Sequence, residues 1–358
     1  MGEYEVKKIA VIGTGGTGYT VAAELSMRGH KVWLCSTGME ENPIKSTEYS
    51  KTMELTGAVQ GSAVIHAVTN DIQIALADVE LVICCTVSNW DEDVARIIAP
   101  YIMPGSKVLL SAGNLGSLIY YRVFKECAAE NIIVGETSGN LFSCRRPDEN
   151  TVLIGNAYGP KDAAAFPARN TPCLIEAFKD VYELTPSSCI LEAAFSAPNL
   201  LSHISLTLVN AGAIENSREP YYIFKQGICR STINLADGLW KEKKAVMDAL
   251  GFHCAPSPSN SFRKYANQDI HEFDHFKDLE GPDSLTVRHI TEDIPILGCL
   301  FLSVARAVGV ETPLYASMVK VAEAINQTNY YEQGRTTENL GIGHLRGIQI
   351  PQYFQQAD

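Results

Sequence analysis

Three glycines near the amino terminus have the spacing of a phosphate-binding turn. Gly13, Gly15 and Gly18 follow an apolar run at residues 9–12 and precede a helical stretch at 17–28. In that context the first glycine permits a tight turn, the second lets the backbone approach a diphosphate, and the third allows close helix–strand packing. The segment predicts a nicotinamide dinucleotide site and oxidoreductase chemistry, with these loop residues in contact with the cofactor: Gly13, Thr14, Gly15, Gly16, Thr17 and Gly18.

A second group of residues that could do chemistry surrounds His203. Asn199 lies four positions before it, Thr207 four positions after it and Asn210 seven positions after it. In a helix these spacings place all four side chains on one face, although the rest of the segment is apolar. Buried polar groups need partners or a ligand. From the residues alone, a structural histidine and a ligand-binding histidine both remain open.

The end of the second expected strand bears on the choice of cofactor. Where NAD-binding proteins usually carry Asp or Glu for the ribose 2′-hydroxyl, this chain has Ser36 and Thr37. No carboxylate there repels a 2′-phosphate, and the two hydroxyls can donate to it. Glu40 and Glu41 lie close by, no arginine follows directly, and Lys45 can reach in. We therefore expect NADP(H) to be favoured over NAD(H), with Ser36 and Thr37 contacting the cofactor.

The elements that position these residues differ between the two halves of the chain. In the first half, short apolar runs alternate with helical stretches, which predicts a doubly wound parallel sheet of the Rossmann type. We expect strands near residues 9–12, 32–35, 81–87, 108–111 and 132–134, and a further strand near 151–154. Thr86 and Asn114 lie at strand ends on the ligand-binding edge, so they should border the nicotinamide half of the cofactor.

After about residue 190 strand signals nearly vanish and helical periodicity dominates. Long helical segments are expected at residues 192–216, 236–250, 296–308 and 313–327. The sequence therefore predicts a fold of α/β plus all-α class. It consists of an NAD(P)-binding Rossmann domain at 1–187 and a mostly helical substrate and catalytic domain at 188–358.

Four further stretches are distinctive when taken together: residues 135–138 with 141–145, residues 199–210, residues 288–295, and residues 309–314 with 334–336. They resemble the octopine/nopaline (opine) dehydrogenase family, and the similarity covers nearly the whole chain. The resemblance implies that an amino acid condenses with a 2-oxo acid, pyruvate by default. It further implies that the imine is then reduced by NAD(P)H to an N-(1-carboxyalkyl) amino acid.

The same resemblance implies roles for individual residues. His203 falls at the position of the catalytic acid/base, and Asp293 would hold its imidazole in one tautomer. Arg288 would bind a substrate carboxylate. The residues expected to lie near the substrates in addition are Asn199, Glu136 and Thr137.

Each of these roles has a structural alternative. Asp293 also suits the start of the apolar helix that follows it, a role compatible with catalysis. Arg288 can form a salt bridge, and Glu136 with Thr137 can be purely structural. One departure is Ile204, because the family often has proline directly after the histidine. Without that proline the helix should continue unkinked.

Two other classes of protein are considered. Ketopantoate reductases and hydroxyacid dehydrogenases, NADP oxidoreductases with a similar layout, would be expected to use a lysine on the equivalent helix, and residues 192–216 contain none. A dinucleotide-sensing protein without turnover is the second alternative. The residue types at positions 203, 288 and 293 argue against it.

Composition limits partners and location. The chain has 358 residues and a formal net charge of -12, so nucleic acid and membrane surfaces are unfavourable partners. There is no signal peptide pattern and no apolar run long enough to span a bilayer, so a cytoplasmic location is expected. The ten cysteines are expected to be buried free thiols. His271 and His275 lack a third ligand, so no metal is expected. Family analogy suggests a homodimer.

Overall fold

The computed structural model describes residues 5–40, 51–266 and 275–356, so Glu41, Lys45 and His271 lie outside it. The chain divides into two compact units, one up to Ala193 and one from Ala194. Helix α6 (Ile190–Ser196) spans this division. The division expected from the sequence, after residue 187, falls a few residues earlier.

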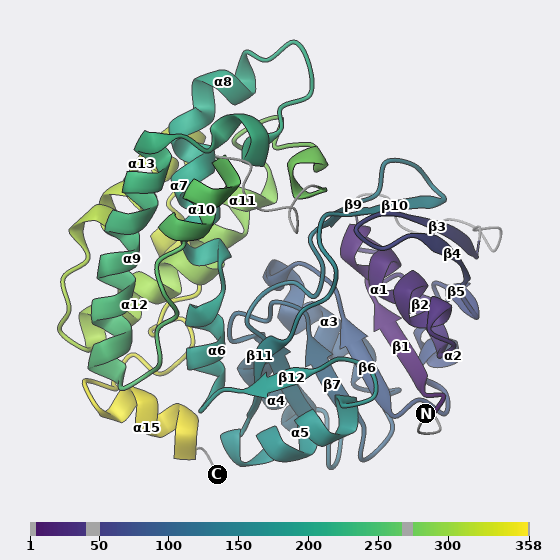
Figure 1. Cartoon of the computed structure of the whole chain (residues 1–358). Coiled ribbons are helices and arrows are strands. Elements are labelled where there is room, and N and C mark those ends of the chain that lie inside the picture. Colours follow the sequence, from purple (N-terminus) through teal and green to yellow (C-terminus); the bar gives the residue numbers. More distant parts are fainter. Residues whose placement is uncertain (1–4, 41–50, 267–274, 357–358) are drawn as a thin grey trace. The chain divides into compact units, whose positions relative to one another are not determined.

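The first unit contains an eight-stranded sheet in the order β12-β11-β8-β7-β6-β1-β2-β5 (Figure 1). All neighbouring strands are parallel except β11, which runs antiparallel to β8. The chain leaves β1 for β2 on one side and later for β6 on the other, so the order reverses beside β1. The bounds are β1 Lys8–Ile12, β2 Lys31–Cys35, β5 Ala67–Thr69, β6 Leu81–Cys84, β7 Lys107–Leu110, β8 Ile133–Thr137, β11 Lys161–Phe166 and β12 Leu184–Pro186.

Helices cover both faces of this sheet, as a doubly wound fold requires. Ile9 and Val11 point into one core cluster, while Ala10 and Ile12 point into the other, because side chains alternate along a strand. Burial on both faces explains why these strands are continuous apolar runs. The helices of this unit are α1 Gly16–Met27, α2 Ile72–Leu76, α3 Asp91–Ile98, α4 Gly116–Glu126 and α5 Thr171–Phe178.

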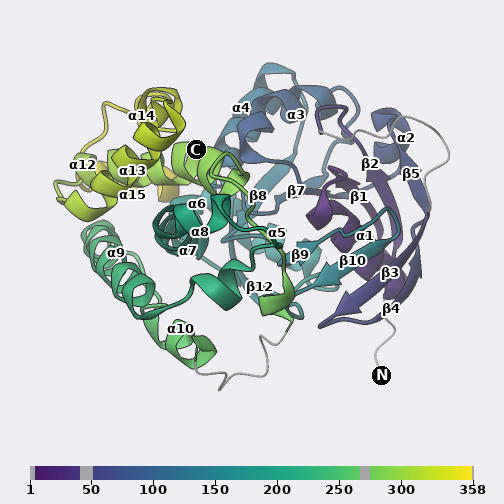
Figure 2. The same ribbon diagram turned by 90° about the horizontal axis from the view of Figure 1, so that it is seen from above.

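A second, four-stranded sheet packs on α1 and was largely missed by the sequence analysis. Its order is β4-β3-β10-β9, and only the strand at 151–154 was expected. Helix α1 contacts strands of both sheets, so it lies between them (Figure 2). The bounds are β3 Thr52–Gly57, β4 Gly61–Val64, β9 Cys144–Arg145 and β10 Thr151–Ile154.

The second unit is mostly helical, as predicted, and α7 packs against α9 and α11. Helix α7 continues past Ile204 to Thr207, as expected without a proline there. The single long segment expected at 192–216 is wrong, because the helix is interrupted before α7 at Ala197 and Pro198 and again by a 3-10 turn at Leu208–Asn210. A π-helical turn, Ile294–Gly298, follows α11. The helix bounds are α7 Asn199–Thr207, α8 Ala211–Glu215, α9 Arg230–Leu250, α10 Ser259–Ala266, α11 Arg288–Thr291, α12 Cys299–Ala307, α13 Pro313–Asn326, α14 Tyr330–Gln333 and α15 Gln349–Gln356.

The sequence analysis also made predictions about membrane-spanning segments and about the cysteines. Among them, no helix is both long and apolar enough to cross a bilayer. All ten cysteines are free, as expected, but they are not all buried. Cys127, Cys173 and Cys229 are exposed, which corrects that part of the prediction.

Candidate active site

The glycine turn has the geometry that its spacing predicts. Gly13 follows β1 with φ +107°, and a Cβ there would lie 2.8 Å from the carbonyl oxygen of Cys85. A Cβ on Gly18 would lie 1.8 Å from the carbonyl oxygen of Gly13, so the helix can approach the strand only with glycine here. At Gly15 a Cβ would meet nothing within 4 Å, which leaves open space over the backbone. Gly13 therefore permits the turn, Gly15 leaves the backbone open to a ligand, and Gly18 allows the helix to contact the strand closely.

The start of α1 fits the diphosphate of a dinucleotide. Gly15 caps the helix without any side-chain hydrogen bond, and no acidic residue lies in the first turn. The Thr14 hydroxyl oxygen is buried and, within the described residues, has no hydrogen-bond partner. The free amides of Gly16 and Thr17 carry the positive end of the helix dipole. An anion bound here would satisfy groups that the protein leaves open, and Thr86 lies against Gly13 at the same edge.

Arg146 brings a cation to this helix and was missed by the sequence analysis. It follows β9, and its guanidinium carbon lies 3.8 Å from the centre of the Tyr19 ring in α1. Its backbone nitrogen would be 3.9 Å from a Cβ on Gly16. Its Nε is buried and, among the described residues, has no hydrogen-bond partner. The approach depends on the small sheet, so no local motif could have revealed it.

The loop after β2 differs from the expectation on which the cofactor choice was based. The Ser36 hydroxyl donates to the Glu40 carboxylate at 2.8 Å, and the Thr37 amide donates to it at 3.0 Å. A carboxylate is therefore present at the end of the second strand, supplied by Glu40, four residues after Ser36. This corrects the premise that nothing there repels a 2′-phosphate.

Asn114 connects two loops at the carboxyl edge of the large sheet. It is buried, and its side-chain amide donates to the Ser88 hydroxyl at 3.5 Å. Ser88 in turn donates to the carbonyl oxygen of Ala112 at 3.4 Å. Asn114 therefore lies at the predicted edge, where its contact holds together the loops after β6 and β7.

Glu136 and Thr137 lie inside β8, whereas the sequence analysis placed them after the strand. Glu136 is fully buried, and its carboxylate accepts hydrogen bonds from the amides of Leu115 at 2.8 Å and Ser117 at 3.1 Å. These amides belong to the start of α4, so the carboxylate caps that helix. The Thr137 hydroxyl donates to the carbonyl oxygen of Gly139 at 2.7 Å. These contacts favour the structural alternative over a substrate-binding role.

His203 and Asp293 meet in the helical unit, although 90 positions separate them. The Nδ1 of His203 hydrogen-bonds the carboxylate of Asp293, and each residue is 9% exposed. The Asn199 side-chain amide donates to the other carboxylate oxygen of Asp293 at 3.4 Å. Because an ionised carboxylate only accepts, it fixes the proton on Nδ1. Nε2 is then the nitrogen that can exchange a proton with a ligand.

A second histidine stacks on the first. The rings of His203 and His289 have centroids 3.8 Å apart and planes inclined by 17°. The Nδ1 of His289 is hydrogen-bonded to the Thr207 hydroxyl at 3.3 Å. On the predicted polar face of α7, hydrogen bonds to other side chains are thus made by Asn199, His203 and Thr207. Asn210 instead donates to the carbonyl oxygens of Leu206 and Gly227, which makes it structural.

Arg288 remains accessible at the start of α11. Its side chain is 47% exposed, and its guanidinium lies 3.9 Å from the Glu292 carboxylate. Glu292 is 13% exposed, but a 3.9 Å separation is too long for a direct hydrogen bond, so the contact is weak. The guanidinium can therefore turn to a carboxylate ligand without losing a strong partner.

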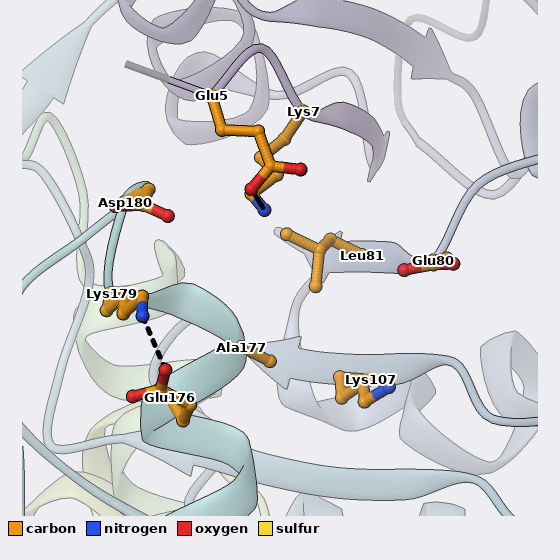
Figure 3. A pocket seen from close by; sticks show the side chains of 9 residues that line it. All are labelled: Glu5, Lys7, Glu80, Leu81, Lys107, Glu176, Ala177, Lys179 and Asp180. Carbon is orange, nitrogen blue, oxygen red and sulfur yellow. Dashed lines mark hydrogen bonds and ion pairs between the residues drawn. The ribbon is translucent and has the colours of Figure 1, made fainter. Parts of the chain in front are cut away.

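A charged cavity lies at the other edge of the large sheet. It has a volume of about 270 Å³ and is lined near the amino ends of β1, β6 and β7 by Lys7, Leu81 and Lys107 (Figure 3). The glycine turn follows the carboxyl end of β1, so this cavity is not the dinucleotide site. No cluster of three potential metal ligands occurs among the residues that the structure describes.

The two halves of the chain match models of different protein families. Residues 186–326 match the model described as NAD/NADP octopine/nopaline dehydrogenase, alpha-helical domain. Residues 9–143 match the model of ketopantoate reductase PanE/ApbA. The helical half, which carries His203 and Asp293, decides between the two. The helical half therefore matches the alpha-helical domain of the octopine/nopaline dehydrogenases, and the chain as a whole resembles that family.

Relatives cover the chain from end to end. An opine dehydrogenase from Arthrobacter sp. (strain 1C) is 28% identical, with 97% of this chain and 98% of that protein covered. Octopine dehydrogenase solved with NADH and L-arginine has a TM-score of 0.70 at 16% identity, with 99% of each chain covered. It was also solved with NADH and pyruvate. Yersinopine dehydrogenase bound to NADP+ has a TM-score of 0.63 at 13% identity, with 98% of each chain covered.

These matches decide between the main alternatives. The protein is an NAD(P)-dependent oxidoreductase, so the interpretation as a sensor without turnover is not retained. The Rossmann unit is shared with ketopantoate reductases, as the second family match indicates. The helical domain is not matched by that model.

Proposed function

We propose that the protein joins the amino group of an amino acid to a 2-oxo acid, with pyruvate as the default, and reduces the resulting imine. The observation that carries the proposal is the buried pair of His203 and Asp293. Support also comes from the octopine dehydrogenase relative, which was solved with NADH and L-arginine and with NADH and pyruvate. The match of the helical half to the octopine/nopaline dehydrogenase domain model also favours this reaction class.

In this proposal the residues of the helical unit transfer protons and bind substrate carboxylates. His203, held at Nδ1 by Asp293, accepts a proton at Nε2 from the ammonium group of the amino acid, which frees the amine to attack the 2-oxo group. The imidazolium then returns that proton to the carbinolamine hydroxyl, which leaves as water. Asn199 keeps the Asp293 carboxylate in position. Arg288 binds a carboxylate of one substrate. The bound dinucleotide supplies the hydride for the imine carbon, and Gly13 to Gly18 with Arg146 hold its diphosphate.

The reaction is tested by following oxidation of NADH and NADPH with pyruvate and a panel of amino acids. Oxidation that requires both an amino acid and a 2-oxo acid supports the proposal. Oxidation with a 2-oxo acid alone would place the enzyme with the hydroxyacid dehydrogenases and overturn it. Mass spectrometry of the product should show the mass of the secondary amine.

Substitution of Arg288 by lysine should weaken substrate binding selectively. Lysine keeps the charge but loses the two-pronged geometry that matches a carboxylate. We expect the KM of one carboxylate substrate to rise about tenfold while the affinity for the dinucleotide is unchanged. Arg263→Lys, at an exposed arginine of α10, is the control. A larger effect on dinucleotide affinity than on substrate KM would contradict this role.

The stacking of the two rings predicts that His289 positions His203. Two substitutions of His289 test this role. His289→Ala removes the ring that fixes the His203 plane, so kcat should fall about tenfold, since small misplacements near reacting atoms are costly. His289→Phe keeps a flat ring and should retain most of kcat. Both variants should keep the KM for the dinucleotide. Equal losses in the two variants would mean that stacking does not position His203.

A further inference from the structure

The carboxylate of Glu40 occupies a ring of donors at the end of β2. Each of its oxygens accepts two hydrogen bonds, which uses about all the acceptor directions of a carboxylate. The donors are the amides of Thr14 at 3.3 Å, Thr37 at 3.0 Å and Gly38 at 3.0 Å, and the hydroxyl of Ser36 at 2.8 Å. They come from two separate loops, the glycine turn and the segment after β2.

These contacts fix a negative charge at the place where a dinucleotide fold receives the adenosine ribose. No lysine or arginine among the described residues is hydrogen-bonded or ion-paired to Glu40. Burial by itself would raise the pKa of Glu40. Hydrogen bonds from the Thr37 amide, the Ser36 hydroxyl and the Thr14 amide outweigh it, and the pKa lies below its ordinary value. The group is therefore an anion throughout the neutral pH range.

We propose that Glu40 determines the cofactor and makes the enzyme selective for NAD(H) over NADP(H). The proposal rests on the proposed function for its cofactor class and adds the choice between the two dinucleotides. A ribose 2′-hydroxyl can donate to the carboxylate in place of the longest contact, the one from Thr14. A 2′-phosphate would bring a second anion against a fixed one.

An alternative use of the same donors is that a 2′-phosphate displaces Glu40 and takes its hydrogen bonds. The displaced carboxylate would remain tethered two residues from Gly38, so it would still face the phosphate at short range. Like charges at such distances repel strongly when no cation is between them. The four donors therefore stabilise the internal anion, which acts as a barrier to a phosphorylated ribose.

Binding measurements test this without any turnover. We expect the wild-type protein to bind NADH at least about tenfold more tightly than NADPH, because the 2′-phosphate meets the fixed charge. Competition by AMP and by adenosine 2′,5′-bisphosphate isolates the 2′ position, and AMP should compete better. Glu40→Gln and Glu40→Ala should shrink both differences, chiefly by improving the affinity for the phosphorylated ligands. Glu54→Gln, which removes an exposed charge from β3, should leave both ratios as in the wild type.

Preference of the wild type for NADPH, or equal binding of the two, would overturn the proposal, as would variants at Glu40 with unchanged ratios. The wild-type comparisons decide the question even if a Glu40 variant fails to fold. Selective NADH binding without oxidation in the presence of an amino acid and a 2-oxo acid would leave this inference intact and reject the proposed reaction.

Discussion

His203→Ala should lose turnover by roughly 10²- to 10⁴-fold, the usual contribution of a general acid/base. The substitution removes the imidazole that Asp293 orients, so its Nε2 can no longer protonate the carbinolamine hydroxyl. Dinucleotide affinity should stay unchanged, because the glycine turn belongs to the other unit of the chain. Steady-state rates with saturating substrates and direct NADH titration measure the two quantities separately.

The control for this substitution is His344→Ala. His344 is an exposed histidine of the same unit. It should keep normal kcat and normal NADH affinity. Near-normal turnover in His203→Ala would remove His203 from the mechanism, whereas joint loss of turnover and folding would call for His203→Gln, which keeps a polar side chain of similar length.

Asp293→Asn is expected to cause the second largest loss, on the order of 10²-fold or more in kcat. The amide can donate to Nδ1 of His203, which would favour the tautomer that carries its proton on Nε2. That tautomer cannot accept a proton at the reacting position. The ring would remain in place, so the KM values should change much less than kcat.

Asp283→Asn is a matched control for this change, because Asp283 is an exposed aspartate just before α11. A thermal unfolding midpoint close to that of the wild type would show that Asp293→Asn keeps the fold. If Asp293→Asn and Asp283→Asn had the same kcat, the carboxylate would not orient the histidine. If kcat fell only in proportion to the folded fraction, its role would be structural.

The fold could be predicted where the signal is local. Gly13, Gly15 and Gly18 are close in sequence, and their steric tasks depend on the turn that they form themselves. The parallel strands were recognisable because both of their faces are buried. The small sheet was missed because β3 is paired with β10 far along the chain. Its alternating pattern, with Met53 and Leu55 buried, was present as a weak signal.

The candidate site was accessible from sequence only in part. The residue types at His203, Arg288 and Asp293 were identified through the family resemblance. The contact between His203 and Asp293 depends on how α7 packs against α11 and the turn that follows it. Glu136 shows why chemistry cannot be read from residue type alone, since its carboxylate accepts hydrogen bonds from amides at the start of α4. Glu40 was noted as a neighbour, but the return of its side chain to Ser36 is a property of the turn.

The parallel pairing of β3 with β10 also has a consequence for synthesis of the chain. Glu54 lies opposite Thr151, so the small sheet cannot close until the ribosome has released the segment around residue 154. Until then β3 pairs only with β4, its edge for β10 stays open, and the part of α1 that contacts β9 and β10 is uncovered. Fragments that end before β10 should therefore be prone to aggregation and to proteolysis, even though they contain the complete glycine turn.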